Sequence, residues 1–326
     1  MSQERQPLQK VNLEEIDEVT GFFVAEEYVW KAYEKGFLTA GDEADGDVNG
    51  WVERFCAEAE ENGTTFDPNF VKSVCTLGIY AGLRDEFYQR SGCGRSIYPN
   101  RDEYEGEFFQ GKKHGSGHYI FLSKGKSEID KIVESEIKTR YNGDLKKADE
   151  LVIRSIAEKY QIGVHVVAGV IEYGFFPCYH GDYVAGKRSG CGIMKNKDAT
   201  IYKGEFLENK REGQGVFYYL NGDIYSGNWK GGLKHGYGTY HFVGGGEYRG
   251  EWISSVFTQG QWILQDGTYY EGKFDKLNRP FDSNASMHYP RIKLAQTGTF
   301  KRGLWAPTSQ LQVCDEVPVD GIAWVD

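Results

Sequence analysis

The sequence predicts a mainly β protein, built as an elongated, twisted antiparallel sheet of stacked β-hairpins with a small helical N-terminal head and a helical insertion. First, its 326 residues include 42 Gly, 22 Tyr, 19 Phe and 7 Trp, a combination typical of short strands joined by tight turns. Second, one tyrosine-led phrase recurs at a fixed step along the chain. Third, the phrase alternates with period two, as a strand does.

The repeated phrase begins at four tyrosines that are each 23 residues apart: Tyr179, Tyr202, Tyr225 and Tyr248. Weaker copies begin at Tyr80, Tyr104 and Tyr270, and a partial copy begins at Thr297. Degenerate outer copies are typical of the terminal caps of a repeat array. The regular step therefore predicts a repeat architecture of about seven units.

The unit that begins at Tyr202 illustrates the spacing. Tyr202, Gly204 and Phe206 fall on one face of a strand because side chains alternate in direction. The polar stretch ENKREG is expected to turn the chain with help from Gly213, and GQGVFYYL is expected to return as the second strand. The glycines leave flat backbone on which an aromatic ring of a neighbouring unit is expected to lie, which predicts a ladder of rings.

The phrase Tyr-x-Gly-x-Trp/Phe-x-x-Gly-x-x-x-Gly-x-Gly resembles the MORN (membrane occupation and recognition nexus) repeat, most closely in YSGNWKGGLKHGYG from Tyr225. The resemblance covers roughly residues 80–122 and 179–305. It implies a twisted single-layer sheet with an aromatic-lined groove. Such repeats occur in structural and tethering proteins, among them the radial spoke heads of cilia, junction and cytoskeletal scaffolds, and regulatory segments of some lipid kinases and methyltransferases.

Five segments are predicted from the repeat and its interruptions. They are an acidic helical head at 1–75, two repeats at 76–126, an insertion at 127–178, further repeats at 179–305 and an extended tail at 306–326. The insertion is expected to hold helices over 127–141 and 146–160 and a buried strand over 164–176. It is interpreted either as an arm that binds a partner or as a cover for one face of the sheet. Within the head, the loop from Asp45 imitates a calcium site, but Cys56 stands where a bidentate Glu is required.

The charge distribution argues against nucleic acid and against an anionic membrane as partners. Residues 1–75 carry 6 Lys+Arg against 17 Asp+Glu, a net charge of −11, and the remainder of the chain is close to neutral at +1. The N-terminus has no pattern of an export signal, and the six cysteines form no CxxC pair. A cytoplasmic protein without a cofactor or a metal is therefore expected.

No catalytic constellation is found in the sequence, so the chain is expected not to be an enzyme and to have no small-molecule substrate. The residues expected to form the aromatic, partner-binding face of the repeats are Tyr104, Phe108, Tyr179, Tyr183, Tyr202, Phe206, Tyr225, Trp229, Tyr248, Trp252, Tyr270 and Phe274.

The resemblance implies a scaffold of the cytoskeleton that assembles other proteins of a multi-subunit complex, another MORN protein among them. The cilium or flagellum is the expected place, as a subunit of the axoneme similar to a radial spoke head. Two alternatives stay open. One is a tether that binds acidic phospholipids through turn cations such as Lys112, Lys113, Lys187, Arg188, Lys210 and Arg211. The other is a regulatory subunit of an enzyme.

Overall fold

The computed structural model describes residues 79–314 apart from 88, 99, 101, 302 and 303, together with Ala57 and Glu60. The rest of the head, its calcium-like loop and the end of the tail lie outside these residues. The described chain divides into two compact units: one runs to Lys113 and includes Tyr119–Ser123, and the other holds His114–His118 and the chain from Lys124 onward.

The first unit is a set of antiparallel strands in sequence order. Strand β1 (Ile79–Arg84) pairs with β2 (Arg90–Ile97), and β2 pairs with β3 (Glu103–Phe109). Strand β4 (Lys112–Ile120) contributes residues to both units and is followed by a short 3₁₀ turn, Leu122–Lys124.

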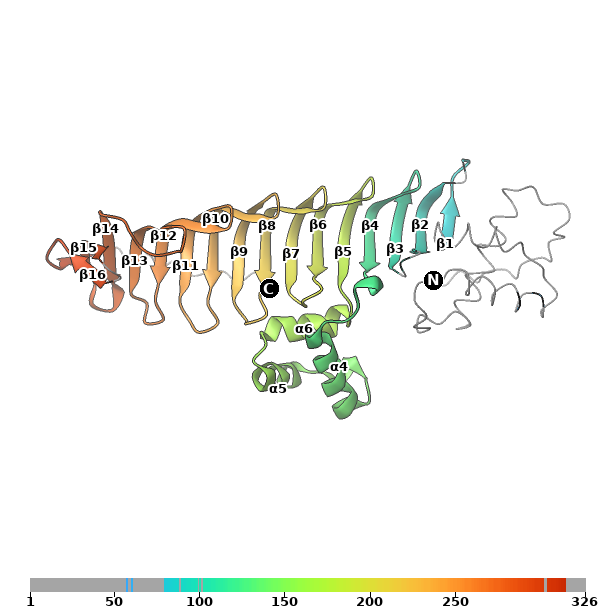
Figure 1. Cartoon of the computed structure of the whole chain (residues 1–326), viewed down its shortest axis with the longest axis horizontal. Helices are drawn as coiled ribbons and strands as arrows, with labels where there is room; N and C mark the ends of the chain where they lie inside the picture. Colours follow the sequence, from blue (N-terminus) through green and yellow to red (C-terminus); the bar gives the residue numbers. More distant parts are fainter. Residues whose placement is uncertain are drawn as a thin grey trace. The chain divides into compact units, whose positions relative to one another are not determined.

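The second unit contains a longer sheet in which each strand pairs antiparallel with the next one along the chain, from β5 to β16 (Figure 1). Its repeat strands are β5 (Cys178–Val184), β6 (Lys187–Lys195), β7 (Ile201–Leu207), β8 (Lys210–Tyr218), β9 (Ile224–Lys230), β10 (Leu233–His241), β11 (Glu247–Ile253) and β12 (Val256–Ile263). The terminal strands are β13 (Tyr269–Lys273), β14 (Ala285–Tyr289), β15 (Leu294–Lys301), β16 (Leu304–Pro307) and β17 (Gln312–Val313). The predicted fold class, a mainly β protein of stacked antiparallel hairpins, is confirmed.

The hairpin turns are tighter than the sequence analysis expected. In the unit from Tyr202, only Glu208 and Asn209 lie between β7 and β8, and both have positive φ, 48° and 71°. A pair of left-handed residues is the type I′ turn, whose twist matches that of the flanking strands. The expected role of Gly213 in the turn was wrong: Gly213 lies inside β8, next to the shift in pairing register between β7 and β8.

The described part of the tail does not simply extend away from the sheet. Strand β17 pairs with β15, so Gln312 and Val313 add to the same sheet that β16 joins. A 3₁₀ turn, Pro290–Ile292, precedes β15. The second unit therefore ends in a small group of strands in which β16 and β17 both pair with β15.

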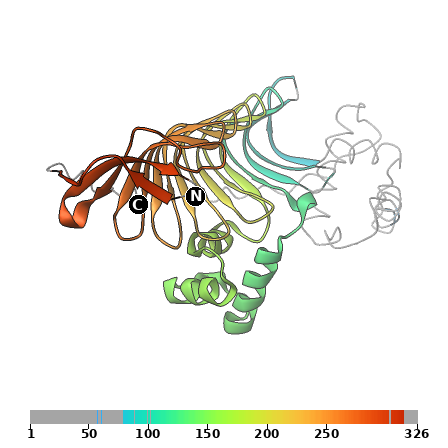
Figure 2. The same ribbon diagram turned by 60° about the vertical axis from the view of Figure 1, so that its left-hand side comes forward.

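The insertion contains three helices: α4 (Glu128–Tyr141), α5 (Glu150–Tyr160) and α6 (Val164–Tyr173), with a 3₁₀ turn Leu145–Lys147 between the first two. Helix α4 begins at a capping box in which Ser127 and Asp130 satisfy each other's backbone N–H groups. Helix α5 is capped by Asp149, whose side chain accepts from the N–H of Val152. Figure 2 shows the three helices gathered near the ends of the strands.

The strand expected over 164–176 was wrong, because its first ten residues form α6. Short apolar runs do not distinguish a buried strand from a buried helix by periodicity alone. Here Val166, Val167 and Val170 are all fully buried, which is the spacing of one helix face. Packing against α4 and α5 outweighs the strand preference of the valines.

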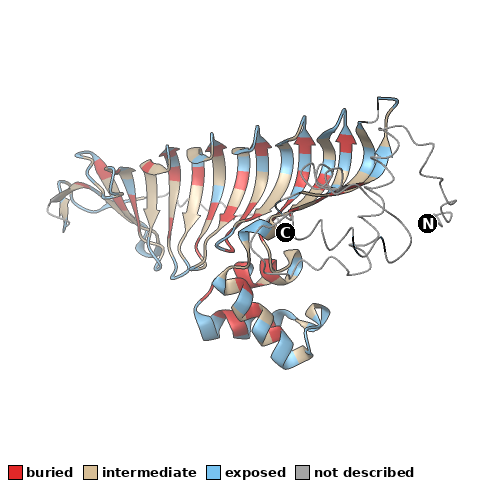
Figure 3. Ribbon diagram, turned by 45° about the vertical axis from the view of Figure 1, so that its right-hand side comes forward, coloured by how far each residue is buried: buried red, intermediate tan, exposed pale blue. Residues whose placement is uncertain are grey.

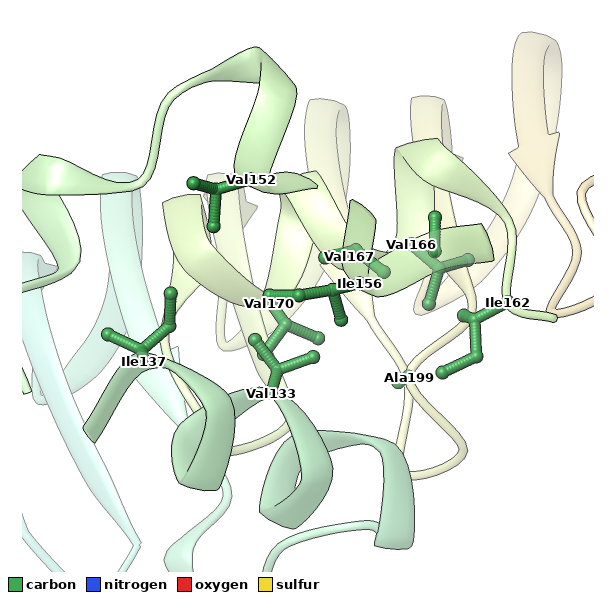
Figure 4. Close-up of a cluster of buried hydrophobic side chains, with 10 residues drawn as sticks. Val133, Ile137, Val152, Ile156, Ile162, Val166, Val167, Val170 and Ala199 are labelled. Atoms are coloured by element: carbon green, nitrogen blue, oxygen red, sulfur yellow. The ribbon is translucent and has the colours of Figure 1, made fainter. Parts of the chain in front are cut away.

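The helices share a hydrophobic core with the loops at the ends of the strands (Figure 4). Val133 and Ile137 of α4, Ile156 of α5 and Val170 of α6 are between 0% and 1% exposed, and Ala199, from the loop between β6 and β7, completes the cluster. The Gly163 N–H donates to Leu220 O (2.7 Å) in the loop between β8 and β9. The insertion is therefore docked on the connections between strands through this shared core.

Candidate partner-binding face

The repeats of the second unit place the two aromatic residues of each phrase on one side of the sheet, here called the ring face. Within a unit, the Tyr202 and Phe206 rings meet edge to face with centroids 5.1 Å apart, and Tyr225 meets Trp229 at 5.3 Å. Between units, Tyr202 meets Trp229 at 5.3 Å, again edge to face. The ring quadrupole favours this edge-to-face geometry. Because Tyr202 contacts both Phe206 and Trp229, it joins its own hairpin to the next one. The predicted ring ladder is present.

The rings of the ladder are core residues and not an open surface (Figure 3). Of the twelve predicted face residues, Tyr248 is half-buried and the other eleven are at most 5% exposed. The first unit follows the same rule, with Tyr104 and Phe108 buried and 5.0 Å apart. A partner that approached this side of the sheet would contact the residues beside the ladder. Partner binding by the twelve residues themselves stays a prediction.

Tyr179, Tyr202 and Tyr225 each lie over glycines of their own hairpin, and not over those of a neighbouring unit as expected from the sequence. In the unit from Tyr202, Gly204 and Gly215 face each other across β7 and β8. A Cβ atom added at Gly215 would clash with the Tyr202 ring. The Tyr202 hydroxyl donates to Glu205 O at 3.0 Å, and Tyr225 repeats this bond to Asn228 O at 3.0 Å. The phrase Tyr-x-Gly therefore seats one ring flat on backbone within one hairpin.

Burial raises the pKa of the ladder tyrosines. Desolvation of the phenolate is the largest cause for Tyr179, Tyr202 and Tyr225, and it raises the pKa of Tyr270 to about 12. Because the neutral hydroxyls are already bonded to backbone carbonyls, these tyrosines are structural hydrogen-bond donors.

A row of cations covers the ladder, at one fixed position of the repeat. Arg188, Arg211 and Lys234 stand directly after the first residue of β6, β8 and β10, so they are 23 residues apart. The Arg211 guanidinium lies 4.3 Å from the Trp229 ring centroid, and the Lys234 ammonium lies 4.2 Å from that of Trp252. Such contacts are favourable cation–π interactions. In the next unit Phe257 takes this position and stacks on Tyr248, so the row ends at Lys234.

The three cations have no carboxylate partner within the described part of the chain. The Arg211 Nη2 atom donates to Gly232 O (2.7 Å), and Arg188 donates to the Asn209 carbonyl (3.0 Å) and contacts Met194 Sδ. Burial lowers the pKa of all three groups; for Lys234 burial, together with the charge of Arg211, lowers the pKa to about 8. The ring face therefore has three half-buried positive charges that its own acids do not neutralise.

Lys234 was not singled out by the sequence analysis, and Arg188 and Arg211 were interpreted as cations exposed at a turn. Their constant 23-residue step was a signal in the sequence, because a side chain at one repeat position meets the same rings in every unit. Each hairpin contains a shift in the pairing register of its two strands, and this shift determines the direction in which these side chains point. In the unit from Tyr202 the shift lies between Gly204 and Glu205. That shift was not predictable from the pattern alone.

Among the described residues, one serine–histidine pair and one buried cysteine resemble catalytic groups. Ser286 Oγ lies 2.8 Å from His288 Nε2, but Glu271 also approaches Nε2, at 3.9 Å, and so does not orient the other ring nitrogen as a triad requires. Burial raises the pKa of the Cys178 thiol to about 11, which keeps it protonated. Among the described residues, no group of three or more His, Cys, Asp or Glu side chains could hold a metal ion.

Successive hairpins of this chain have nearly the same length and contact each other through their aromatic rings, which is the architecture of a β-hairpin repeat protein. More particularly, a model of the MORN repeat matches residues 104–124, 179–198, 202–224 and 225–247, so this chain contains MORN repeats, as its phrase predicted. The hairpin from Tyr248 lies outside these matches. It keeps the glycine pair, with Gly250 opposite Gly260, but its tyrosine ring stacks on Phe257. The comparison with curated proteins gave no match. In the described residues, no helix is both long enough and apolar enough to cross a membrane.

Proposed function

We propose that this chain is a non-enzymatic scaffold whose repeats hold other proteins of a multi-subunit assembly in place. The observation that carries the proposal is the row of Arg188, Arg211 and Lys234 on the ring face. Charges that are partly desolvated and lack a counter-ion have a free-energy cost in the isolated chain, which a complementary acidic partner would offset. The buried ladder beneath them provides a rigid floor, so little ordering entropy would be lost on binding.

The more specific part of the proposal is an assembly of the cytoskeleton, namely a ciliary or flagellar axoneme in a radial spoke head-like role. Its support is the resemblance of the repeat phrase to scaffold proteins of that kind. A chain that is mostly repeats, with a helical cluster docked on the loops of its sheet, suits a part that connects several subunits.

A phospholipid tether is the second candidate, and the side-chain geometry favours it less. Of the six turn cations that suggested lipid binding, Arg188 and Arg211 lie over rings and Lys187 forms an ion pair with Glu208 at 3.0 Å. In the first unit, Lys113 also lies over a ring, 4.2 Å from the centroid of Tyr119. Cations turned onto the sheet are poorly placed to reach a flat anionic surface, which favours exposed Lys and Arg.

The test is affinity purification of the tagged full-length protein at its natural level from ciliated cells, with mass spectrometry and localisation by fluorescence. A triple variant, Arg188→Gln with Arg211→Gln and Lys234→Gln, is compared with a control triple variant of exposed lysines, Lys197→Gln with Lys210→Gln and Lys230→Gln. We expect stoichiometric protein partners and an axonemal signal for the wild type and the control, and loss of partners for the ring-face variant.

Recovery of the same partners with the ring-face variant would contradict a role for this face. A plasma-membrane signal without a stoichiometric protein partner would favour the lipid tether. Circular dichroism of both purified variants shows whether any loss of partners reflects misfolding.

A further inference from the structure

The spacing of the three cations specifies the shape of an acidic ligand. Arg188, Arg211 and Lys234 occupy the same position in β6, β8 and β10, which are second strands of successive hairpins. Neighbouring strands lie about 4.8 Å apart, so the positions recur about every 9.6 Å across the sheet. A ligand that engages all three cations must present acidic groups at that interval along a line that crosses the strands.

A polyproline II segment has this interval. It has three residues per turn and a rise of about 3.1 Å, so every third side chain lies on one face at about 9.3 Å. A β-strand does not fit, because residues three apart point to opposite faces. In an α-helix, side chains seven residues apart lie on one face at an interval of about 10.5 Å. This interval is longer than that of the cations, so the mismatch grows along the row.

Half-buried rings beside the cations provide the other half of such a site. Tyr219 and Tyr240 both lie near the Lys234 ammonium, with ring centroids 5.9 and 4.8 Å away, and their own centroids are 5.4 Å apart. Phe242 continues this line at 5.0 Å from Tyr240. Flat aromatic surfaces are what proline rings pack against in known polyproline recognition.

The Lys234 ammonium can still be reached from solvent. No hydrogen bond to Lys234 Nζ is found among the described residues. If this atom were fully buried, it would therefore be a buried nitrogen without a hydrogen-bond partner. Among the described residues the one buried side-chain oxygen or nitrogen of that kind is Asn278 Oδ1. Lys234 Nζ is therefore not fully buried. A carboxylate that arrived at it would replace water and form a charge-assisted hydrogen bond.

We propose that the ring face binds an acidic peptide in the polyproline II conformation, with a carboxylate at every third residue and proline or other apolar residues between. The three carboxylates pair with Arg188, Arg211 and Lys234, and the residues between them pack on Tyr219, Tyr240 and Phe242. This inference rests on the proposed scaffold function and names the chemistry of the partner segment.

The experiment is a fluorescence anisotropy titration of the full-length protein with three labelled peptides. (Pro-Pro-Glu)₃ has the predicted spacing, (Pro-Pro-Gln)₃ lacks the charge, and (Pro-Pro-Pro-Glu)₃ keeps three carboxylates at a longer interval. We expect the first to bind at least about tenfold more tightly than either control, which is the size of effect that one well-placed charge pair produces. Each of Arg188→Gln, Arg211→Gln and Lys234→Gln should weaken it about tenfold, and Lys210→Gln should leave it unchanged.

A pH titration of the binding adds a readout that general damage to the fold would not give. The groups that face Lys234 are Arg211 and the rings of Tyr219, Tyr225, Tyr240 and Trp252. Since the unbound lysine loses its proton near pH 8, affinity should fall as pH rises through that value. In Lys234→Arg the charge persists, so affinity should stay constant over the same range.

Equal binding of the two acidic peptides, or of the glutamine peptide, would overturn the proposed spacing. Binding to phosphoinositide vesicles that the ring-face substitutions abolish, without peptide binding, would assign the cations to a lipid headgroup and overturn the peptide proposal. If no peptide binds while the triple variant still loses its cellular partners, the scaffold function stands and this ligand chemistry fails.

Discussion

The Tyr202 ring shows how one residue type determines three features of the repeat. Its face covers Gly215, its edge meets Trp229 of the next hairpin, and its hydroxyl donates to Glu205 O. A phenylalanine would keep the first two contacts and leave the Glu205 carbonyl without this donor, while a larger residue at the glycine would displace the ring. The conserved geometry of these contacts in successive units makes the pair of glycines as necessary as the tyrosine.

Gly215→Ala is expected to destabilise the protein by about 2 kcal/mol, because the added methyl overpacks the site of the Tyr202 ring. The matched control is Gly244→Ala, since a Cβ atom there meets nothing within 4 Å and the backbone has no positive φ. The control should change the free energy of unfolding by less than about 0.5 kcal/mol. Urea unfolding followed by tyrosine and tryptophan fluorescence measures both. Equal effects of the two substitutions would show that the ring does not need the bare backbone.

At this scale, much of the ladder was predictable from the residue pattern. The alternation in Tyr-x-Gly-x-Phe places Tyr202 and Phe206 on one face, and both are found there as neighbouring rings. The ring that lies over Gly215 was not predictable, because it depends on how β8 pairs with β7. The position of Lys234 over Trp252 depends on contact between separate hairpins, which a single phrase does not encode.

Among the elements, the helical insertion is joined to the sheet by a buried ion pair. Lys195 at the end of β6 donates to Asp130 Oδ1 of α4 at 2.5 Å, and both side chains are fully buried. Asp130 also accepts from Ser127 N, so one carboxylate both begins the helix and holds it on the strand. A buried ion pair adds little net stability over an apolar pair, but removal of one partner leaves an uncompensated charge.

Lys195→Met should therefore cost about 3–5 kcal/mol, because Asp130 stays buried without its counter-ion. The double variant Lys195→Met with Asp130→Asn should recover part of this loss, since the neutral amide can still accept from Ser127 N. Chemical unfolding of the two variants and of Lys197→Met, an exposed neighbour in sequence, gives the comparison. A double variant less stable than Lys195→Met alone would mean that the Asp130 carboxylate contributes mainly through the helix cap.

The limits of prediction at this scale are clear in the insertion. Helix α4 could be predicted because its apolar residues recur at helical spacing, and in the structure a capping box of Ser127 and Asp130 begins it. The segment 164–176 has no side-chain cap, since Gly163 precedes α6, and its valines favour strands. Its helical state is decided by the core that it shares with Ile156 and Val133, which belong to the other two helices.

At the scale of the whole molecule, the many buried tyrosines link stability to alkaline pH. Burial raises the pKa of Tyr104, Tyr179, Tyr202 and Tyr225 in the folded state, while tyrosines of an unfolded chain ionise near pH 10. Above that value the unfolded state binds fewer protons than the folded state, so the stability that these groups contribute below about pH 10 is lost as pH rises further.

The expected result is a steep fall in the free energy of unfolding between about pH 10 and pH 11.5. Lys234 acts in the opposite direction at lower pH, because its lowered pKa makes stability rise between about pH 8 and about 10.4. Urea unfolding at several pH values, with tyrosinate absorbance as a second signal, separates the two windows. Ionisation of all 22 tyrosines near pH 10 without loss of the folded signal would contradict the burial of the ladder hydroxyls.

The repeat architecture also predicts that a whole unit can be removed. Deletion of residues 202–224 would join Ile201 to Tyr225, which stands at the same repeat position as Tyr202. Trp229 would then meet Tyr179 as Phe206 now does, at a centroid distance close to 5.1 Å. Gly245 (φ 90°) would take the place of Gly222 (φ 92°), the residue that lies against Gly163 at the start of α6.

Since each unit contacts only its neighbours, the shortened protein should fold cooperatively with native-like circular dichroism and a lower melting temperature. The control is a deletion of 12 residues from the same region, 202–213, which should not fold because it reverses the direction of every later strand. The shortened ring face keeps Arg188 and Lys234 one repeat apart, so an acidic polyproline II peptide should still bind, about tenfold more weakly than to three cations. A 23-residue deletion that unfolds the protein as completely as the 12-residue one would show that the hairpin from Tyr202 has a role beyond its place in the stack.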